Sequence, residues 1–259
     1  MKHNDSRSLA MLQAIAFEIS VGCPLSKLHS GICPISDKHR WDKLDTSRPM
    51  SDELIIDSCE TAYHQLGFRG WITWHNFNEP MLEFDRIENL ILQLRERIST
   101  FRTEVSTNGE VLPDDLKRMK CFDRIRLKNY TGRDQSALLA SHPNVEHDAT
   151  PFLDERMASP VIQNQHRCRR MYDELPIDFY GNGHICAGDW QGNVPIGNIW
   201  DDGIEDVAER FLAVRDQIGQ EPVAPDAPEY CRNCGLSMRY GDCIIDQEIF
   251  EEITQKRGY

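Results

Sequence analysis

The sequence predicts an α/β fold built on a parallel sheet, and three observations lead to this prediction. Segments typical of strands begin near residues 70, 102 and 122, and a helical segment lies between each pair. This alternation is the signature of βα units on a parallel sheet. The composition is that of a globular protein, with 40% hydrophobic and 27% charged residues. The length of 259 residues corresponds to one or two domains.

The first predicted elements are a strand and a long loop. Residues 14–21 (AIAFEISV) are typical of a strand that enters a buried sheet. The loop that follows is rich in Pro, Gly, Ser and His, and it carries Cys23 and Cys33. Both cysteines therefore follow the end of the first predicted strand.

The segments after this loop alternate between helix and strand. A helix is expected over 52–66, because Ser51 is a suitable N-cap and Gly67 is a suitable C-terminal stop. Leucine and isoleucine residues at helical spacing predict a second helix over 85–98. The predicted strands around this helix are 70–75, 101–107 and 122–129. A short helix over 113–121 precedes the last of these strands.

The pattern changes from about residue 166, where cysteines and glycine-rich turns begin. Short strands or hairpins are expected over 177–200 and a helix over 203–218. A Pro-rich linker over 219–228 and a final acidic helix over 246–256 follow. We therefore predict two units, residues 1–165 and residues 166–259.

Charge and hydropathy exclude several classes of function. The chain has 42 acidic and 29 basic residues and a formal charge of −13, so nucleic acids and anionic membranes are not expected as main partners. No apolar run approaches the roughly 18–20 residues that cross a bilayer. The apolar stretch 9–19 lacks the small-residue cleavage site of a signal peptide. We expect a cytoplasmic protein that binds neither nucleic acid nor membrane.

The nine cysteines form the most informative pattern in the chain. In a cytoplasmic protein, grouped cysteines more often bind metal or do redox chemistry than form disulfides. Cys168 and Cys186 make one spaced pair, and a C-x2-C pair lies near the C-terminus, with Cys243 as a reserve ligand. Two such pairs can surround an iron–sulfur cluster or a structural zinc ion, and a packed thiol is a further alternative.

Three segments follow the ends of neighbouring predicted strands: the cysteine loop, HNFNEP and STNG. In parallel sheets, ligands bind at the carboxyl ends of the strands. We therefore expect one cavity at this edge to be faced by Cys23, Cys33, Asn78, Glu79 and Asn108.

The order of these motifs resembles that of radical S-adenosylmethionine (SAM) enzymes with a C-terminal auxiliary-cluster extension, called SPASM or, in its shorter form, twitch. The segments that carry the resemblance are QLGFRGWITWHNFNEPML, STNG, GNGHICAGD, PIGNIWDDGIEDVAERF and YCRNCG. The resemblance implies a partial (β/α)6 TIM-like barrel with a small C-terminal iron–sulfur extension. It implies a SAM site formed by Asn78, Glu79, Pro80, Ser106 and Asn108. It also implies an auxiliary [4Fe–4S] cluster held by Cys168, Cys186, Cys231 and Cys234.

The N-terminal cysteine segment departs from the family pattern. The radical cluster of this family uses three cysteines spaced C-x3-C-x2-C, whereas GCPLSKLHSGICP places Cys23 and Cys33 at C-x9-C. His29 or His39 is then the candidate third ligand, because histidine replaces cysteine in some iron–sulfur sites. A ligand from outside the protein is the other alternative. One or two [4Fe–4S] clusters are expected.

The resemblance implies a radical SAM oxidoreductase, in which SAM and the clusters carry the hard chemistry. The implied substrate is a secondary alcohol of a sugar or cyclitol, with a peptide as the other possibility. The implied electron donor is a reductant protein such as flavodoxin or ferredoxin. The alternative is a non-catalytic iron–sulfur protein that serves electron transfer or partner binding.

Overall fold

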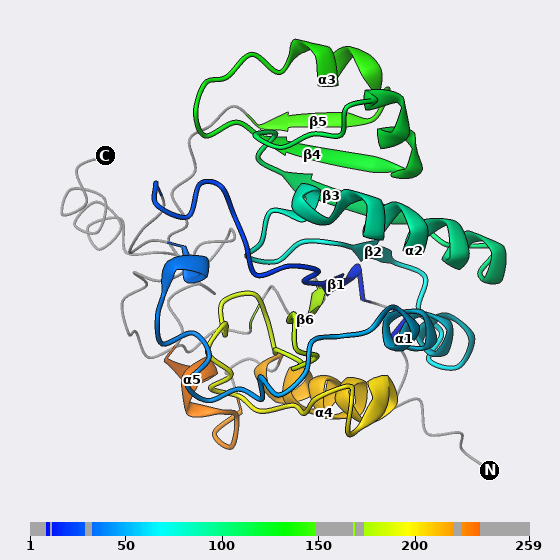
Figure 1. Ribbon diagram of the computed structural model, residues 1–259. Coiled ribbons are helices and arrows are strands. Elements are labelled where there is room, and N and C mark those ends of the chain that lie inside the picture. The colour runs from blue at the N-terminus through cyan, green and yellow to red at the C-terminus, as the bar shows by residue number, and fades with distance from the viewer. Residues whose placement is uncertain are drawn as a thin grey trace.

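The computed structural model describes residues 9–10, 12–28, 33–148, 168, 174–219 and 224–233. The strands in this part of the chain form one six-stranded sheet in the order β5-β4-β3-β2-β1-β6, and all neighbours run parallel (Figure 1). The sheet is open, so the expected α/β partial-barrel architecture is confirmed. Its strands are β1 (Ala14–Phe17), β2 (Trp71–Thr73), β3 (Thr103–Thr107), β4 (Arg124–Lys128), β5 (Val145–Asp148) and β6 (Glu174–Ile177).

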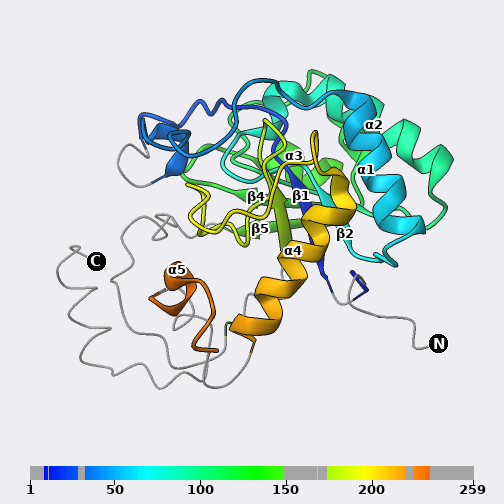
Figure 2. The ribbon, with the colours of Figure 1, turned by 90° about the horizontal axis from the view of Figure 1, so that it is seen from below.

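Three long helices pack beside one another along the sheet. The helix α1 contacts both α2 and α4, and Figure 2 shows the three in one layer. No described helix combines the length and the apolar character needed to cross a membrane. The helices are α1 (Asp52–His64), α2 (Phe84–Arg97), α3 (Ser136–Ser141), α4 (Gly203–Ile218) and α5 (Glu229–Arg232), with 3-10 helices η2 (Pro34–Ser36), η3 (Pro80–Glu83) and η4 (Leu116–Cys121).

The predicted start of the first helix is confirmed by its capping contact, and the helix ends at His64, two residues before the predicted end. The Ser51 side chain accepts a hydrogen bond from the backbone N–H of Leu54 at 3.2 Å. Gly67, just beyond α1, has a φ of 70°, a conformation that glycine adopts without strain. The helices predicted over 85–98 and 203–218 are α2 and α4, and the short helix after Pro113 is the 3-10 helix η4.

The largest difference from the sequence prediction lies in β6. We predicted short strands or hairpins over 177–200, but β6 pairs with β1 in parallel, from Ala14–Glu174 to Phe17–Ile177. Beyond β6 only isolated bridges occur in the described chain, because left-handed glycines such as Gly181 and Gly197 turn the backbone before a ladder can extend. The sheet thus includes a strand from the predicted C-terminal unit.

The sequence analysis also missed α3 and β5. The sequence of β5, VEHD, has one apolar residue in four and weak strand propensity. It forms because β4 offers an open edge, with Ile125 opposite Val145. The helix predicted over 246–256 lies outside the described residues.

The pairing register gives the sheet two different faces, because alternate residues of a strand point to opposite sides. Side chains of one face are fully buried in a single core with those of α1, α2 and α4: Ile15, Phe17, Ile72, Val105, Ile125, Leu127, Leu175 and Ile177. The opposite face is polar over β2 to β5 and includes Thr73, Glu104, Ser106, Arg124, Arg126 and Glu146.

Candidate functional site

The carboxyl group of Glu79 joins the ends of β2 and β3. Its oxygens accept hydrogen bonds from Thr107 Oγ1 at 2.6 Å, from the backbone N–H of Asn108 at 2.9 Å and from that of Met81 at 3.1 Å. Thr107 is the last residue of β3, whereas Glu79 leads through Pro80 into η3. Glu79 therefore holds the NEP segment against the end of the neighbouring strand.

Glu79 is also almost completely buried, with 1% of its surface exposed. Burial raises the pKa of its carboxyl to about 7, and the three hydrogen-bond donors oppose this rise. The protonation state of this group therefore changes near neutral pH.

The NEP segment is bonded to the chain that leaves β1. The backbone N–H of Glu79 donates to the carbonyl of Gly22 at 2.8 Å. The Asn78 amide donates to Ser20 Oγ at 3.3 Å, and Ser20 Oγ in turn lies 3.5 Å from the carbonyl of Glu79. These contacts fix the approach to Cys23.

Cys23 lies half-buried at the same edge. Its Sγ accepts a 3.6 Å hydrogen bond from the Asn108 side chain. Burial raises the pKa of the Cys23 thiol to about 11, and the nearby Glu79 and Cys33 contribute to the rise. A thiolate at this position needs an electropositive partner such as a metal. The structure thus brings three predicted site residues, Cys23, Glu79 and Asn108, into one chain of contacts.

Asn108 is held by groups that the sequence analysis missed. Gln135 Nε2 donates to the Asn108 carbonyl at 2.8 Å, and the Asn108 side-chain oxygen accepts from the backbone N–H of Glu110 at 2.9 Å. The role of Thr107, which donates to Glu79, could have been suspected because Thr107 lies in the STNG motif directly before Asn108. No sequence signal marks Gln135, because it lies 27 residues away.

Ser106, Cys33 and the two histidines have different surroundings. Ser106 lies on the polar face, and its backbone N–H donates to His75 Nδ1 at 3.0 Å. Cys33 is half-buried, and its carbonyl accepts a 3.1 Å hydrogen bond from the backbone N–H of Ser36. His39 is exposed, with its Nδ1 2.8 Å from Asp42 Oδ2. His29 lies outside the described residues.

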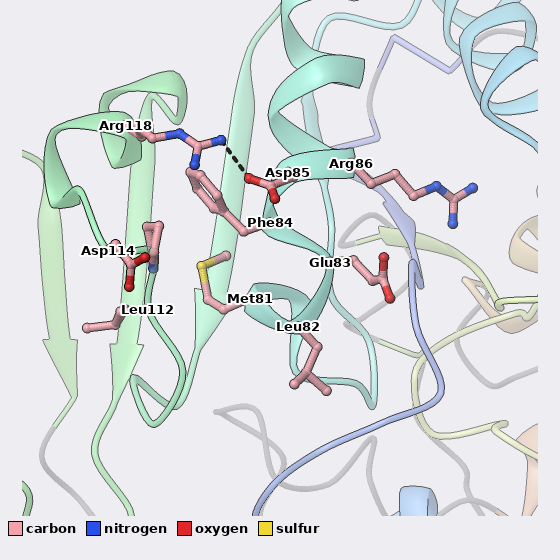
Figure 3. A pocket seen from close by; sticks show the side chains of 10 residues that line it. Met81, Leu82, Glu83, Phe84, Asp85, Arg86, Leu112, Asp114 and Arg118 are labelled. Carbon is pink, nitrogen blue, oxygen red and sulfur yellow. Dashed lines mark hydrogen bonds and ion pairs between the residues drawn. The ribbon is translucent and has the colours of Figure 1, made fainter.

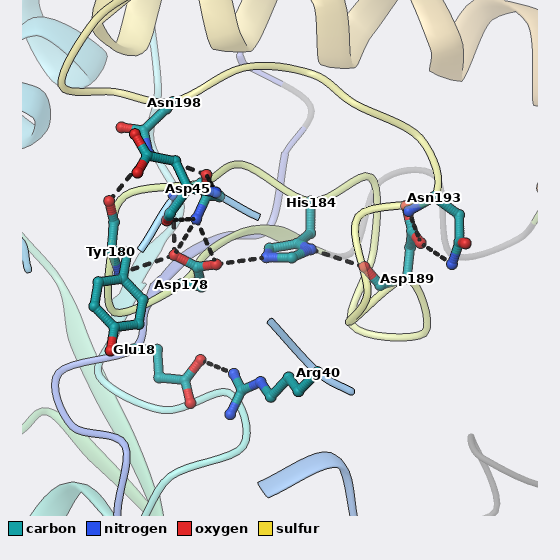
Figure 4. A network of polar contacts seen from close by, with 10 residues as sticks. Glu18, Arg40, Asp45, Asp178, Tyr180, His184, Asp189, Asn193 and Asn198 are labelled. Carbon is teal, nitrogen blue, oxygen red and sulfur yellow. Dashed lines mark hydrogen bonds and ion pairs between the residues drawn. The ribbon is translucent and has the colours of Figure 1, made fainter. Parts of the chain in front are cut away.

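A second polar network lies at the carboxyl end of β6, and the sequence analysis did not predict it (Figure 4). The Asp178 carboxylate accepts from the backbone N–H groups of Tyr180 and Asn182 at 2.9 and 3.0 Å. His184 Nε2 lies 3.2 Å from Asp178 Oδ2, and its Nδ1 lies 2.7 Å from the carbonyl of Asp189. Burial lowers the pKa of His184, but the interactions with Asp178 and Asp189 together outweigh it, and the net pKa is raised.

The described C-terminal cysteines lie in two places, one at the end of α4 and one beside α5. The backbone N–H of Cys168 donates to the carbonyl of Ile218, the last residue of α4, at 2.8 Å. Cys186 Sγ accepts from the backbone N–H of Gly188 at 3.3 Å, and Tyr230 donates to the Gly188 carbonyl at 2.5 Å. Since Tyr230 precedes Cys231 on α5, this helix is tied to the turn that carries Cys186.

The predicted metal ligands are described only in part. Among the residues that the structure describes, no three His, Cys, Asp or Glu side chains form a group that could hold a metal ion. Each predicted set includes members outside this part of the chain, which are His29, Cys234 and Cys243. The two ligand sets therefore stay predictions.

A shallow cavity of about 320 Å³ lies elsewhere, at the start of α2 (Figure 3). Both arginines that line it are paired: Arg118 with Asp85 at 2.6 Å, and Arg86 with Asp52 at 2.6 Å. None of the predicted site residues lines it. We do not place the site there.

No family model matches the sequence, and no curated protein matches it either. Solved structures do match. The crystal structure of BtrN in complex with AdoMet and 2-DOIA has a TM-score of 0.62 over 86% of this chain and 92% of that chain, at 17% identity. Selenomethionine BtrN in an open conformation has a TM-score of 0.58 over 89% and 98%, at 18% identity.

These likenesses decide the fold. The chain shares the fold of BtrN. The likeness extends over most of both chains, and in this chain the shared fold is an open parallel sheet with helices packed along it. The partial barrel that the motifs implied is therefore present, although both identities are low.

Proposed function

We propose that this protein is a radical SAM oxidoreductase. The observation that carries the proposal is the chain of contacts from Cys23 through Asn108 to Glu79, at the carboxyl edge of a radical SAM-like sheet. Ligands of parallel α/β sheets bind at this edge. The BtrN structure, which has this fold, holds AdoMet, that is SAM.

The residues at this edge fit the proposed cofactors. Cys23 and Cys33 supply thiols, and His29 is the proposed third ligand of a [4Fe–4S] cluster, in keeping with the thiolate and imidazole chemistry of such clusters. The amide Nδ2 of Asn76 is buried without a partner in the described chain. A buried donor of this kind fits an acceptor on a bound ligand, such as the SAM carboxylate.

The cluster and SAM together would supply a 5′-deoxyadenosyl radical for hydrogen abstraction. The protein's own part is to position the cofactors and the substrate and to exclude water. Glu79 fixes the NEP segment, whose members Asn78 and Pro80 we place in the SAM site with Ser106. Asn108 orients Cys23 toward the same space.

The substrate class and the second cluster extend this proposal. We place an auxiliary [4Fe–4S] cluster on Cys168, Cys186, Cys231 and Cys234, with Cys243 in reserve, where it would accept the electron that leaves the substrate. The proposed reaction is oxidation of a secondary alcohol of a sugar or cyclitol, with electrons from a flavodoxin or ferredoxin. The cysteine spacing resembles that of the 2-deoxy-scyllo-inosamine dehydrogenase of butirosin biosynthesis, which supports this substrate class.

The test is anaerobic reconstitution with iron and sulfide, followed by an iron count and mass spectrometry for 5′-deoxyadenosine. We expect about eight irons per chain, the content of two [4Fe–4S] clusters. Cys23→Ser should lower the count to about four and abolish 5′-deoxyadenosine. The matched control is Cys121→Ala, a buried cysteine of η4 outside the site, which should change neither.

The C-x9-C spacing of Cys23 and Cys33 favours a second candidate, a non-catalytic iron–sulfur protein. Wild-type protein with about four irons per chain and no 5′-deoxyadenosine would establish that candidate and overturn the first. A peptide-modifying enzyme would form 5′-deoxyadenosine only with a peptide, and polyols would not stimulate it. Cleavage of SAM is therefore measured with and without polyols, and stimulation by a polyol favours the sugar or cyclitol substrate.

A further inference from the structure

A fully buried ion pair lies at the end of β1. Glu18, the residue after β1, is 0% exposed, and its carboxylate pairs with the guanidinium of Arg40, which is 2% exposed (Figure 4). Taking two charges out of water is expensive, so a buried pair rarely adds net stability. A role other than stability is therefore needed to explain the pair.

The position of the pair in the chain indicates this role. Glu18 lies five residues before Cys23, and Arg40 lies seven residues after Cys33. The pair therefore closes the segment that carries both N-terminal cysteines. We call the described residues 18–28 the near arm and residues 33–40 the far arm.

The far arm transmits the position of Arg40 to Cys33. Three successive backbone hydrogen bonds connect them: Ser36 to the Cys33 carbonyl at 3.1 Å, Asp37 to Pro34 at 3.1 Å, and Arg40 to Asp37 at 3.2 Å. The far arm is thus a continuous series of turns. A shift of Arg40 would move Cys33 with it.

Both arms also contact the segment HNFNEP (75–80), which follows β2 and contains NEP. The near arm does so through Gly22 and Ser20, which bond to Glu79 and Asn78. The far arm does so through Arg40, whose guanidinium lies 4.9 Å from the ring centre of Phe77 and 4.2 Å from that of Trp41. Cations over aromatic rings are attracted in this geometry.

The hydrogen bonding of the pair is incomplete. Glu18 Oε1 and the Nε and Nη1 of Arg40 are buried without a hydrogen-bond partner in the described chain. A buried pair that served stability alone needs these groups satisfied. The geometry instead matches a link between the two arms, made by the direct contact of Glu18 with Arg40.

We infer that Arg40 is a positioning residue: with Glu18 it forms a clasp that sets Cys23 and Cys33 relative to each other and to the NEP segment. The link to a cluster rests on the proposed function. The ordering of the two arms is a property of the protein without cofactors, and it can be measured there.

The experiment is timed alkylation with iodoacetamide of cluster-free protein in a chelator, with each cysteine quantified by peptide mass spectrometry. Arg40→Met should raise the alkylation rate of Cys33 by about tenfold, because the reactivity of a protected group follows local opening. Buried Cys59 reports the fold and should stay protected. Arg40→Lys keeps the positive charge but loses the planar guanidinium that lies over Trp41 and Phe77, so its rate should fall between those of wild type and Arg40→Met.

The matched control is Arg48→Met. Arg48 also pairs with a carboxylate, Asp201, and stacks on a ring, Trp200, at 4.5 Å, but it is about half exposed and touches neither arm. Its substitution should leave Cys33 unchanged. Equal effects of Arg40→Met and Arg48→Met, or no effect of Arg40→Met, would overturn the clasp.

If Arg40→Met exposes Cys59, that variant has lost its fold. The double variant Glu18→Leu/Arg40→Met is then used in place of Arg40→Met, since an apolar pair leaves no buried charge unpaired. Faster alkylation of Cys33 with Cys59 protected then supports the clasp, and an unchanged rate refutes it. An iron count on the same variants is read separately. Wild-type protein that binds no iron would end the proposed function without deciding the clasp.

Discussion

Ile125 and Arg126 are neighbours on β4 and lie on opposite faces of the sheet. Ile125 is fully buried in the core beneath the helices. Arg126 has about half of its side chain exposed, and its guanidinium lies 3.1 Å from Glu104 and 3.6 Å from Glu146. One face of this sheet therefore stabilises the fold, whereas the other is free to carry charged groups.

The polar face carries its charges as a connected row. Glu104 is nearly buried and pairs with both Arg124 and Arg126. Burial raises the pKa of Glu104, while the two arginines oppose the rise. The Trp71 ring lies 3.9 Å from the Arg102 guanidinium and 4.5 Å from that of Arg124. Such a row suits a surface that meets polar ligands better than a packed core.

The largest expected effect tests this difference on β4 itself. Ile125→Ala should lower the free energy of unfolding by about 2–5 kcal/mol, because it leaves a cavity in the core. Arg126→Ala should cost less than about 1 kcal/mol, since its pairs are partly exposed and Arg124 still neutralises Glu104. Urea titration measures both. Similar costs for the two variants would mean that the polar face is as important to stability as the core.

The next effect concerns Glu79, which lies at the carboxyl end of β3. Its pKa in the folded protein, about 7, lies above the ordinary value of 4.5. The folded state therefore binds this proton more tightly than the unfolded state. Its contribution to stability is fully present below pH 4.5 and is lost as the pH rises through about 7. The difference corresponds to roughly 3 kcal/mol.

Glu79→Gln should remove this part of the pH dependence. The free energy of unfolding is measured by urea titration at several pH values on both sides of the pKa, and slopes rather than absolute values are compared. The control is Glu83→Gln, an exposed glutamate of the 3-10 helix that Glu79 caps, which should keep the wild-type slope. A wild-type stability that rises with pH across this interval would contradict the assignment.

The elements with local signals were predictable from the sequence. The N-cap Ser51, the stop Gly67 and the helical spacing of α2 are all readable within a few residues. The NEP and STNG segments could be placed together because the ends of parallel strands share an edge. The pairs that sequence reasoning missed, Glu18 with Arg40 and Asp178 with His184, are buried ionisable groups. Hydrophobic periodicity treats charged residues as exposed, so it cannot find them.

Long-range strand pairing was also beyond the sequence. The position of β6 beside β1 depends on pairing across more than half of the chain, for which no local signal exists. The strand β5 depends on the open edge of β4 rather than on its own residues.

A smaller effect separates backbone strain from crowding at the site. Gly109 and Gly132 both have a φ of 72°, but a Cβ on Gly109 would lie 2.3 Å from Gln135 Nε2, whereas one on Gly132 would meet nothing within 4 Å. Gly132→Ala should cost about 1–2 kcal/mol for the left-handed conformation alone. Gly109→Ala should cost more, because Gln135 must release Asn108. Equal costs in urea titration would show that Gln135 moves freely and does not hold Asn108.

The smallest effect is expected on the helix side, at the start of α1. Ser51 accepts a hydrogen bond from Leu54 N–H, so Ser51→Ala leaves that donor without its cap and should cost about 1 kcal/mol. Ser51→Asp should stay close to wild type, because an aspartate also caps and suits the positive end of the helix. Urea titration at pH 7 measures both. Since α1 contacts both α2 and α4, the loss should appear in one cooperative transition with an unchanged slope. A separate early transition for Ser51→Ala would show that α1 unfolds apart from the core, and the apolar face would then not act as a single unit.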